Sequence, residues 1–420
     1  MKPKLLTTLQ DYSWSLFRLD LIAGITVAMV ALPLSLAIAI ASGAEPATGL
    51  ITAIIGGFLI SLLGGSRVQI GGPTGAFIVV VFGVIAAHGY DGLVLATFMA
   101  GIILTLAGFL RAGSLIRFVP ESVISGFTLG IAVIIATSQI KDLLGFNLEK
   151  VPADFLEKIP LLWEARATLN SEALLIGLLS MALIIALRKF FPKFPGLIVA
   201  VALSSLAVYV LGLDVDTLHS RFGALPSSLP MPKLPDLSLS HMVELLPSAL
   251  VIAFLAGVES LLSAMVADKM SNGKHRPNAE ILAQGAANIG SSLFGGLPAT
   301  GAIARTATNI RAGGKTPVAG LVHAVCILLA MMLAASLAGY LAMPALAALL
   351  ILTAWNMSEP HKWKEYAALP KADLFLLLLT FILTVIADLT IAIGLGVVLG
   401  LAIELKRKNA KAQEWQSPEA

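Results

Sequence analysis

Residues Gly71–Phe77 read GGPTGAF and lead directly into an apolar run, IVVVFGVIAA, at residues 78–87. Glycine, proline and threonine before such a run favour extended backbone followed by a helix start, with Pro or Thr near the cap. The apolar helix holds only about fourteen residues, which span roughly 21 Å and cannot cross a membrane. A second stretch, GGLPATGAI at Gly295–Ile303, precedes an even shorter helix. The pattern predicts two half-helices, preceded by extended segments at 68–72 and 294–299 that reach the middle of a membrane.

The composition excludes a soluble globular protein. Of the 420 residues, 57% are hydrophobic and 13% are charged, which is typical of an all-α polytopic membrane protein. The net charge of +3 indicates no nucleic-acid partner. A single cysteine, Cys326, excludes an intramolecular disulfide. The partners expected from composition are the lipid bilayer and a small solute.

Apolar segments divide the chain into fourteen predicted spans. They lie at residues 20–42, 47–63, 74–87, 92–110, 118–138, 172–191, 195–213, 245–267, 279–294, 300–312, 317–340, 342–357, 372–388 and 390–405. With both termini cytoplasmic, only six of the 28 lysines and arginines fall outside, namely Lys141, Lys150, Lys158, Arg166, Arg221 and Lys233. This asymmetry follows the positive-inside rule, and a count of thirteen spans would destroy it.

Seven spans precede a proline-rich segment and seven follow it, so the second seven enter the membrane in the opposite orientation. Such an inverted repeat is common in secondary transporters. The predicted division is an amphipathic cytoplasmic segment at 1–19, a first repeat at 20–213, an extracellular linker at 214–244, a second repeat at 245–405 and a cytoplasmic tail at 406–420.

Two half-helices that begin at mid-membrane would bring two helix N-termini together, and helix N-termini bind anions. The residues predicted to hold the anion are Thr74, Gly75, Ala76, Phe77, Thr300, Gly301, Ala302 and Ile303. Arg305, four residues after Gly301, is predicted to supply a fixed positive charge on the same helix face. The alternatives are ordinary turns at the membrane surface for the two motifs, and an arginine that extends to the cytoplasmic interface.

Glu259 lies at the centre of the eighth span, in IAFLAGVESLLSAMVAD. A carboxyl group in that setting is either paired or protonated, so Glu259 is the candidate proton-coupling group, with Ser260 and Ser263 beside it. A purely structural carboxyl group is the alternative. The polar stripe of Glu280, Gln284 and Asn288 predicts interhelical hydrogen bonding, and a lone His323 is more often a packed side chain than a ligand.

The sequence contains no His/Cys cluster with zinc spacing, no GxxxxGK[ST] motif and no GxSG motif of an intramembrane protease. We therefore expect no cofactor and no enzymatic activity, and we expect ion or substrate gradients to supply the energy for transport.

Residues Gly257–Ala324 closely resemble the signature region of the sulfate permease (SulP) family of anion transporters. The resemblance continues through Ala347–Met357 and Val123–Val133 and includes GGPTGAF, so it covers essentially the whole chain. It implies a core domain of spans 1–4 and 8–11, a gate domain of spans 5–7 and 12–14, elevator-like movement and a homodimer. It also places the substrate pocket between the third and tenth spans and the acidic position of the eighth span at Glu259.

The resemblance implies a secondary active anion transporter in a bacterial inner membrane, with sulfate, a C4-dicarboxylate or bicarbonate as substrate. Glutamate at 259 favours proton symport over sodium coupling. An anion exchanger, an anion channel and a nucleobase symporter remain alternatives within this architecture. Two departures leave specificity and regulation open. Pro33-Leu34-Ser35-Leu36-Ala37-Ile38 stands where many members read P-Q-x-x-A-Y, and no sulfate-transporter/anti-sigma-antagonist domain follows residues 404–420.

Overall fold

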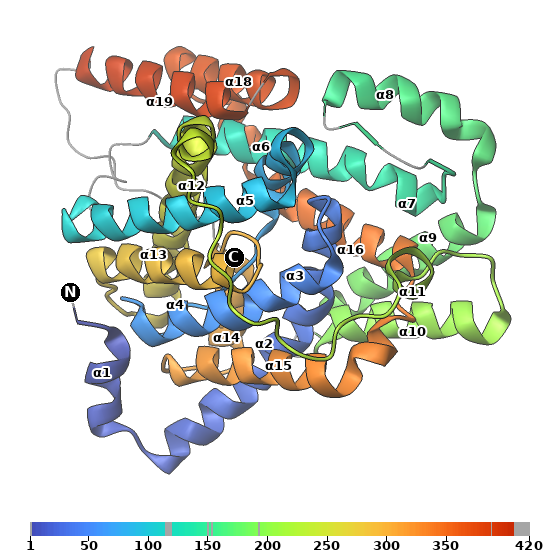
Figure 1. The fold of residues 1–420 in the computed structure, drawn as a ribbon, viewed down its shortest axis with the longest axis horizontal. Helices are drawn as coiled ribbons and strands as arrows, with labels where there is room; N and C mark the ends of the chain where they lie inside the picture. The colour runs from blue at the N-terminus through green and yellow to red at the C-terminus, as the bar shows by residue number, and fades with distance from the viewer. Residues whose placement is uncertain are drawn as a thin grey trace.

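The computed structural model describes residues 2–113, 120–148, 151–152, 154–191, 194–387 and 389–406, which form a bundle of helices (Figure 1). The first half of the chain contains α1 (Lys4–Thr8), η1 (Leu9–Asp11), α2 (Trp14–Ala41), α3 (Pro46–Ile51), η2 (Thr52–Gly56), α4 (Gly57–Leu63), β1 (Gly71–Gly72), η3 (Gly75–Phe77), α5 (Ile78–Phe109), α6 (Glu121–Ser138), α7 (Ile140–Leu144), α8 (Phe155–Glu164), η5 (Ala165–Thr168), α9 (Ser171–Phe190) and α10 (Gly196–Leu211).

The second half contains α11 (Leu218–Phe222), α12 (Leu239–Ser271), α13 (Pro277–Leu293), β2 (Thr300–Gly301), α14 (Ile303–Arg311), α15 (Val318–Ala338), α16 (Met343–Met357), η6 (Pro360–Lys362), α17 (Trp363–Ala367), α18 (Lys371–Ile386) and α19 (Leu389–Lys406). Local signals explain several boundaries. Pro46 and Pro277 open α3 and α13, where a missing N–H costs nothing. Gly212 adopts a left-handed conformation that ends α10.

The two short spans predicted from the sequence are short in the structure. Gly89 has a φ of 70° and breaks α5 into two stretches, 78–88 and 90–109. The first stretch continues from the 3-10 turn η3, and β1 precedes it. In the second half, β2 precedes α14, which has nine residues. Both predicted half-helices therefore follow extended backbone.

A helical segment lies within each of the fourteen predicted spans. Among the described residues, seven helical stretches are long and apolar enough to cross a membrane, namely 14–41, 46–63, 75–109, 121–144, 171–190, 239–271 and 318–338. The chain is thus a multi-pass membrane protein. The predicted tail at 406–420 lies outside the described residues except for Lys406.

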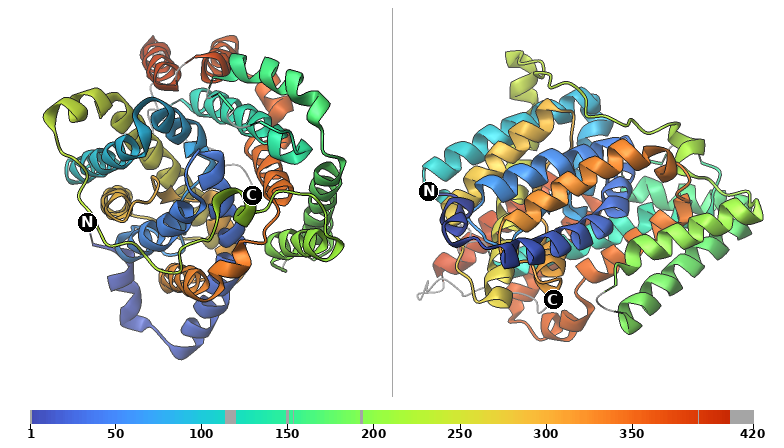
Figure 2. Two further views of the ribbon diagram at one scale, coloured as in Figure 1. Left: turned by 45° about the vertical axis from the view of Figure 1, so that its right-hand side comes forward. Right: turned by 90° about the horizontal axis from the view of Figure 1, so that it is seen from below.

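The helices pack in two groups. One group joins α2, α4, α5, α12, α13, α14 and α15, and the other joins α6, α7, α9, α10, α16, α18 and α19. Figure 1 shows α5, α13, α4 and α15 of the first group one below another, and Figure 2 shows the second group from two further sides. Fewer contacts join the groups, for example between α2 and α16 and between α5 and α6.

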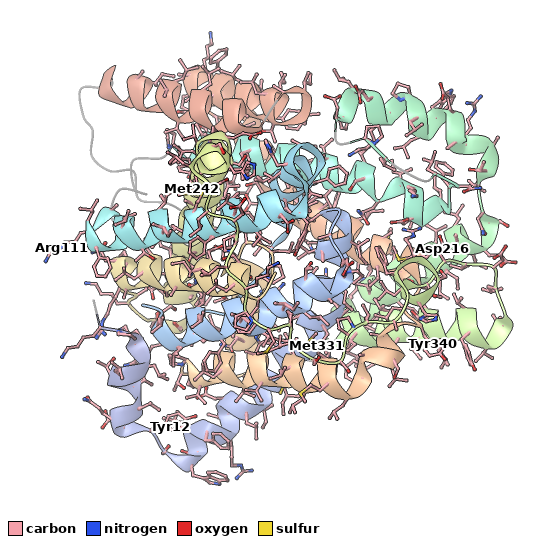
Figure 3. The ribbon with its side chains drawn as sticks, viewed as in Figure 1. Tyr12, Arg111, Asp216, Met242, Met331 and Tyr340 are labelled. Atoms are coloured by element: carbon pink, nitrogen blue, oxygen red, sulfur yellow. The ribbon has the colours of Figure 1, made fainter. Side chains whose placement is uncertain are left out.

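The segment at 1–19, predicted to be amphipathic and cytoplasmic, is not one continuous helix. α1 ends at Thr8, and α2 already begins at Trp14, where the Ser13 side chain caps it by accepting from the Leu16 N–H. Contacts with other parts of the chain hold the segment, because the N–H of Lys4 donates to the Gly64 carbonyl at 2.9 Å. Figure 3 shows Tyr12 at the turn that leads into α2.

The predicted loops are partly helical, and one predicted boundary differs from the structure. The segment at 139–171 contains α7, α8 and η5, and the linker contains α11. α12 begins at Leu239, six residues before the predicted start of the second repeat at 245. The linker is also tied to the turn between α15 and α16, because the N–H of Met343 donates to the Asp216 carbonyl at 2.8 Å. Figure 3 labels Asp216 and Tyr340 in this part of the molecule.

Candidate functional site

The two motifs meet directly in the structure. β1 and β2 form an antiparallel pair in which Gly71 lies opposite Gly301 and Gly72 lies opposite Thr300. The pairing continues in a bond from the Ala302 N–H to the Ile70 carbonyl at 2.8 Å. Glycine is required at Gly301, because a β-carbon there would lie 1.8 Å from the Gln69 side-chain nitrogen. The segment before each half-helix therefore pairs with the segment before the other.

Because β1 and β2 pair, η3, which leads into α5, and α14 begin close to each other, each a few residues after its strand. Of the eight residues predicted to hold an anion, six are buried, while Thr74 and Ile303 are half-buried. Ala304, in the first turn of α14, is exposed. The two helix starts are therefore mostly buried, and Thr74, Ile303 and Ala304 keep exposed surface there.

Arg305 lies fully inside the protein with only 1% of its surface exposed. Its Nη2 donates to the Pro73 carbonyl at 2.6 Å, whereas Nε and Nη1 have no hydrogen-bond partner among the described residues. This burial excludes an arginine that extends to the interface. The predicted same-face relation to Gly301 is also wrong, because Gly301 is a strand residue and α14 begins at Ile303. The guanidinium group lies instead across the first motif, on Gly72 and Pro73.

A β-carbon on Gly72 would lie 2.3 Å from Arg305 Nη1, and Gly72 has a φ of +146°. Only glycine leaves room for the guanidinium group and adopts this backbone conformation easily. Two further α14 side chains bind the same extended segment. The Ile70 N–H donates to Thr306 Oγ1 at 3.0 Å, and Asn309 Nδ2 donates to the Val68 carbonyl at 2.8 Å. One short helix of the second half thus binds the backbone of the first motif.

The threonines of the two motifs lie near helix starts, as predicted, but neither side chain makes a capping hydrogen bond. Thr74 is the N-cap residue of η3, and Thr300 lies two residues before Ala302, the N-cap residue of α14. Thr74 Oγ1 donates to Glu259 Oε2 at 2.7 Å, and Thr300 Oγ1 donates to the Ala256 carbonyl at 2.8 Å. Both acceptors belong to α12, so the hydroxyl groups attach each motif to that helix. Glu259 is half-buried, and Thr74 is the only hydrogen-bond partner given for its side chain among the described residues.

Ser260 and Ser263 have different surroundings from Glu259. Ser263 Oγ lies 3.2 Å from Thr306 Oγ1 on α14. Ser260 Oγ donates to Glu280 Oε1 at 3.0 Å and accepts from the side-chain nitrogens of Gln69 and Gln284, each at 2.7 Å. Neither serine bonds to Glu259, so the predicted trio is not one hydrogen-bonded group.

Glu280 is the centre of a buried network that the sequence only partly indicated. Oε1 accepts from Gln69, Ser260 and Gln284, and Oε2 accepts from the backbone N–H groups of Gly65 and Ser66. The predicted polar stripe along α13 does form interhelical hydrogen bonds. Its last member, Asn288, bonds to both the N–H and the carbonyl of Ala299, just before β2.

Sequence reasoning missed three contributors to the site. They are Gln69, the Pro73 carbonyl and η2. η2 is a π-helical turn that packs against β1, and the hydroxyl group of its Thr52 accepts a hydrogen bond from the Leu297 N–H. A polar Gln69 within a segment predicted to lie at membrane depth was the available signal for the first. Among the described residues, no group of three or more His, Cys, Asp or Glu side chains could hold a metal ion.

Comparison with known proteins identifies the family of the chain. The model of the sulfate permease family matches residues 17–380. The chain belongs to the sulfate permease family. It is 45% identical to the putative sulfate transporter YvdB of Bacillus subtilis over 95% of this chain and 76% of that protein. It is also 30% identical to the bicarbonate transporter BicA of Picosynechococcus over 95% of this chain and 72% of that protein.

Solved structures show the same fold. The transmembrane domain of a cyanobacterial bicarbonate transporter BicA matches with a TM-score of 0.80 and 29% identity, covering 93% of this chain and 98% of that domain. SLC26A9 matches with a TM-score of 0.86 at 17% identity, covering 97% of this chain and 68% of that chain. These sulfate permease relatives are named as sulfate and bicarbonate transporters, which supports anion transport across a membrane as the activity of the chain.

Proposed function

We propose that the protein is a secondary active transporter that carries an anion with protons through a bacterial inner membrane. The observation that carries the proposal is the fully buried Arg305, whose Nε and Nη1 have no partner among the described residues at the point where two half-helices begin. A buried guanidinium group without an acceptor is costly. An anion between the two helix starts would supply acceptors and a balancing charge.

Glu259 is proposed as the proton-coupling group because of its position and its partner. Its carboxyl group bonds to Thr74, a residue of the anion site, and is half-buried. An ionised carboxylate there repels the anion, whereas a protonated one does not. Proton binding and anion binding therefore favour each other, which is the requirement for symport. Sodium coupling is a less favoured form of the same proposal.

The proposed movement follows from the two helix groups. All the side chains of the anion site belong to the group that contains α5, α12 and α14, and fewer contacts join it to the other group. We propose that the first group is a core that moves past the second as a gate, within two inverted repeats of seven spans. A homodimer with cytoplasmic termini completes the proposed arrangement.

The substrate is proposed to be sulfate or a C4-dicarboxylate, with bicarbonate as a third candidate. Uptake of labelled sulfate, succinate, fumarate and bicarbonate into proteoliposomes, with and without a proton gradient, tests this. We expect saturable uptake of at least one of these anions, accelerated by an inward proton gradient. Unsaturable flux would indicate a channel, and flux that needs an internal anion and ignores pH would indicate an exchanger.

Two variants test the roles of the site residues. Glu259→Gln is expected to diminish the effect of the pH gradient while anion binding survives, and Glu164→Gln, at an exposed position on α8, is the matched control. Arg305→Ala is expected to weaken anion affinity at least tenfold, because charge-assisted hydrogen bonds contribute about 1.5–3 kcal/mol each. Undiminished proton-driven accumulation in the Glu259 variant, or unaltered affinity in the Arg305 variant, would contradict the assigned role.

A further inference from the structure

His323 is a second ionisable group close to the anion site. It lies on α15, about 8 Å along the helix from its first residue, and is completely buried. A β-carbon on Gly57 of α4 would lie 3.7 Å from His323 Cε1 and 2.9 Å from the Gly71 carbonyl oxygen. The imidazole and strand β1 therefore contact the same point of α4, on the inner side of the anion site.

Neither ring nitrogen of His323 has a hydrogen-bond partner among the described residues. The hydroxyl group of Ser61 also has no hydrogen-bond partner among the described residues. It lies close to α15, because a β-carbon on Gly320, one turn before His323, would lie 2.0 Å from it. A histidine buried for packing alone normally satisfies at least one nitrogen, since an unsatisfied buried polar group costs about 1–3 kcal/mol. No donor among the described residues occupies the nitrogen lone pair of the ring.

The charge next to His323 comes from the anion site. α2, α3, η2 and α4 pack against α15. α3, η2 and α4 carry no charged residue, and α2 carries only the exposed Arg18 and the buried Asp20 near its start. Asp20 is engaged by the backbone before α15. On α14, Arg311 is exposed, whereas Arg305 is buried. Arg305 Nη1 lies at Gly72, the β1 neighbour of Gly71, and Gly71 and His323 both lie next to Gly57.

We propose that His323 is a second proton-binding site, which makes the protein a carrier of one divalent anion together with two protons. The proposal rests on the proposed function, because it needs the anion at Arg305. Without an anion, the charge of Arg305 opposes a proton on His323. A bound anion offsets that charge, so each ligand strengthens the binding of the other.

Charge balance connects the two protons to the class of substrate. In the empty site, ionised Glu259 balances Arg305, and neutral His323 adds no charge. A divalent anion adds two negative charges, which are compensated when Glu259 and His323 each take up one proton. The net charge of the moving site is then the same when empty and when loaded, which avoids carrying an uncompensated charge through the membrane. A univalent anion would need only the proton on Glu259.

Proteoliposomes loaded with a pH-sensitive dye test the number of protons carried per sulfate ion, or per fumarate ion if the uptake panel selects it. In the unmodified protein we expect two protons per dianion and no effect of an inside-negative potassium diffusion potential. In His323→Gln we expect one proton per dianion and uptake slowed by that potential. His361→Gln, at an exposed position, is the matched control. Two protons per dianion in the His323 variant would overturn the proposal.

A second measurement leaves His323 in place and so does not depend on the folding of its variant. Glu259→Gln in weakly buffered detergent solution is titrated with sulfate or fumarate, while calorimetry reports binding and a dye reports protons. We expect uptake of one proton per bound dianion, and none in Glu259→Gln/His323→Gln. Binding without proton uptake by Glu259→Gln would overturn the proposal for His323 alone. Absence of dianion binding by the unmodified protein would overturn the proposed function as well.

Discussion

Replacing Glu280 with glutamine tests whether the network behind the anion site is built around an ionised carboxylate. Glu280 receives five hydrogen bonds, three at Oε1 and two at Oε2. A carboxylate can accept all five, whereas a protonated carboxyl group would direct a hydrogen at one of the donors. The donors fit this assignment, because Gln69 and Gln284 each divide their two amide hydrogens between Ser260 and Glu280.

The size of the effect follows from counting donors. A glutamine amide with its oxygen at the place of Oε1 turns its NH2 group toward the N–H groups of Gly65 and Ser66, so two buried donors lose their acceptor. The opposite orientation leaves three donors unpaired. At about 1–3 kcal/mol for each unsatisfied buried group, the better orientation costs about 2–6 kcal/mol of unfolding free energy. We expect the unfolding midpoint to fall on the order of 5 °C.

The chain supplies its own probe for this measurement. Cys326 is the single cysteine and is partly buried in α15, so a dye that becomes fluorescent on reacting with thiols reports unfolding. Glu164→Gln, which makes the same chemical change at an exposed position, should leave the midpoint unchanged. A Glu280→Gln midpoint within about 1 °C of the unmodified protein would refute the reasoning, because it would mean that Glu280 is already protonated.

Two further predictions follow from single contacts. Gly72→Ala should lower anion affinity at least tenfold in equilibrium binding. The new β-carbon would clash with Arg305 Nη1, and the backbone conformation at this position costs alanine about 1–3 kcal/mol. Unchanged affinity would show that anion binding does not need Arg305 in its observed position. Lys158 on α8 is only 3% exposed, its ammonium group lies 5.9 Å from the centre of the Phe82 ring, and burial lowers its pKa. A lowered pKa in the folded state means that stability rises with pH up to the ordinary lysine value. Lys158→Met should therefore raise the free energy of unfolding by about 1 kcal/mol near pH 7 and by less near pH 10, and a lower midpoint at pH 7 would contradict this.

The half-helices could be predicted because their signals are local in the sequence. Each motif combines turn-forming residues with an apolar run too short to cross a membrane, and the structure has β1 and β2 in those places, followed by short helices. The central position of Glu259 in a long apolar helix is also a local signal. The polar stripe of α13 was correctly expected to bond between helices, because its spacing repeats with the helix turn.

The partners of these residues could not be predicted, because each polar group had several acceptors within reach. The Thr74 hydroxyl could cap a helix, bind a ligand or bond to another span, and tertiary packing selected Glu259. The position of the Arg305 side chain depends on Pro73, far away in the sequence. The starts of α2 and α12 were misplaced for a different reason, since polar residues in their first turns suggested segments outside the apolar spans.

Two carboxyl groups lie beside Ser260 of α12 in different surroundings, and the contrast supports Glu259 rather than Glu280 as the proposed proton-binding group. Glu280 reaches Ser260 on the buried side, where five donors favour a permanent charge. Glu259, the next residue along α12, is half-buried and bonds to Thr74, a neutral hydroxyl that can donate to a carboxylate or accept from a carboxylic acid. The network at Glu280 holds the extended segment before β1 in place, so the proton proposed to bind Glu259 would change the charge of the proposed anion site without disrupting the backbone that forms it.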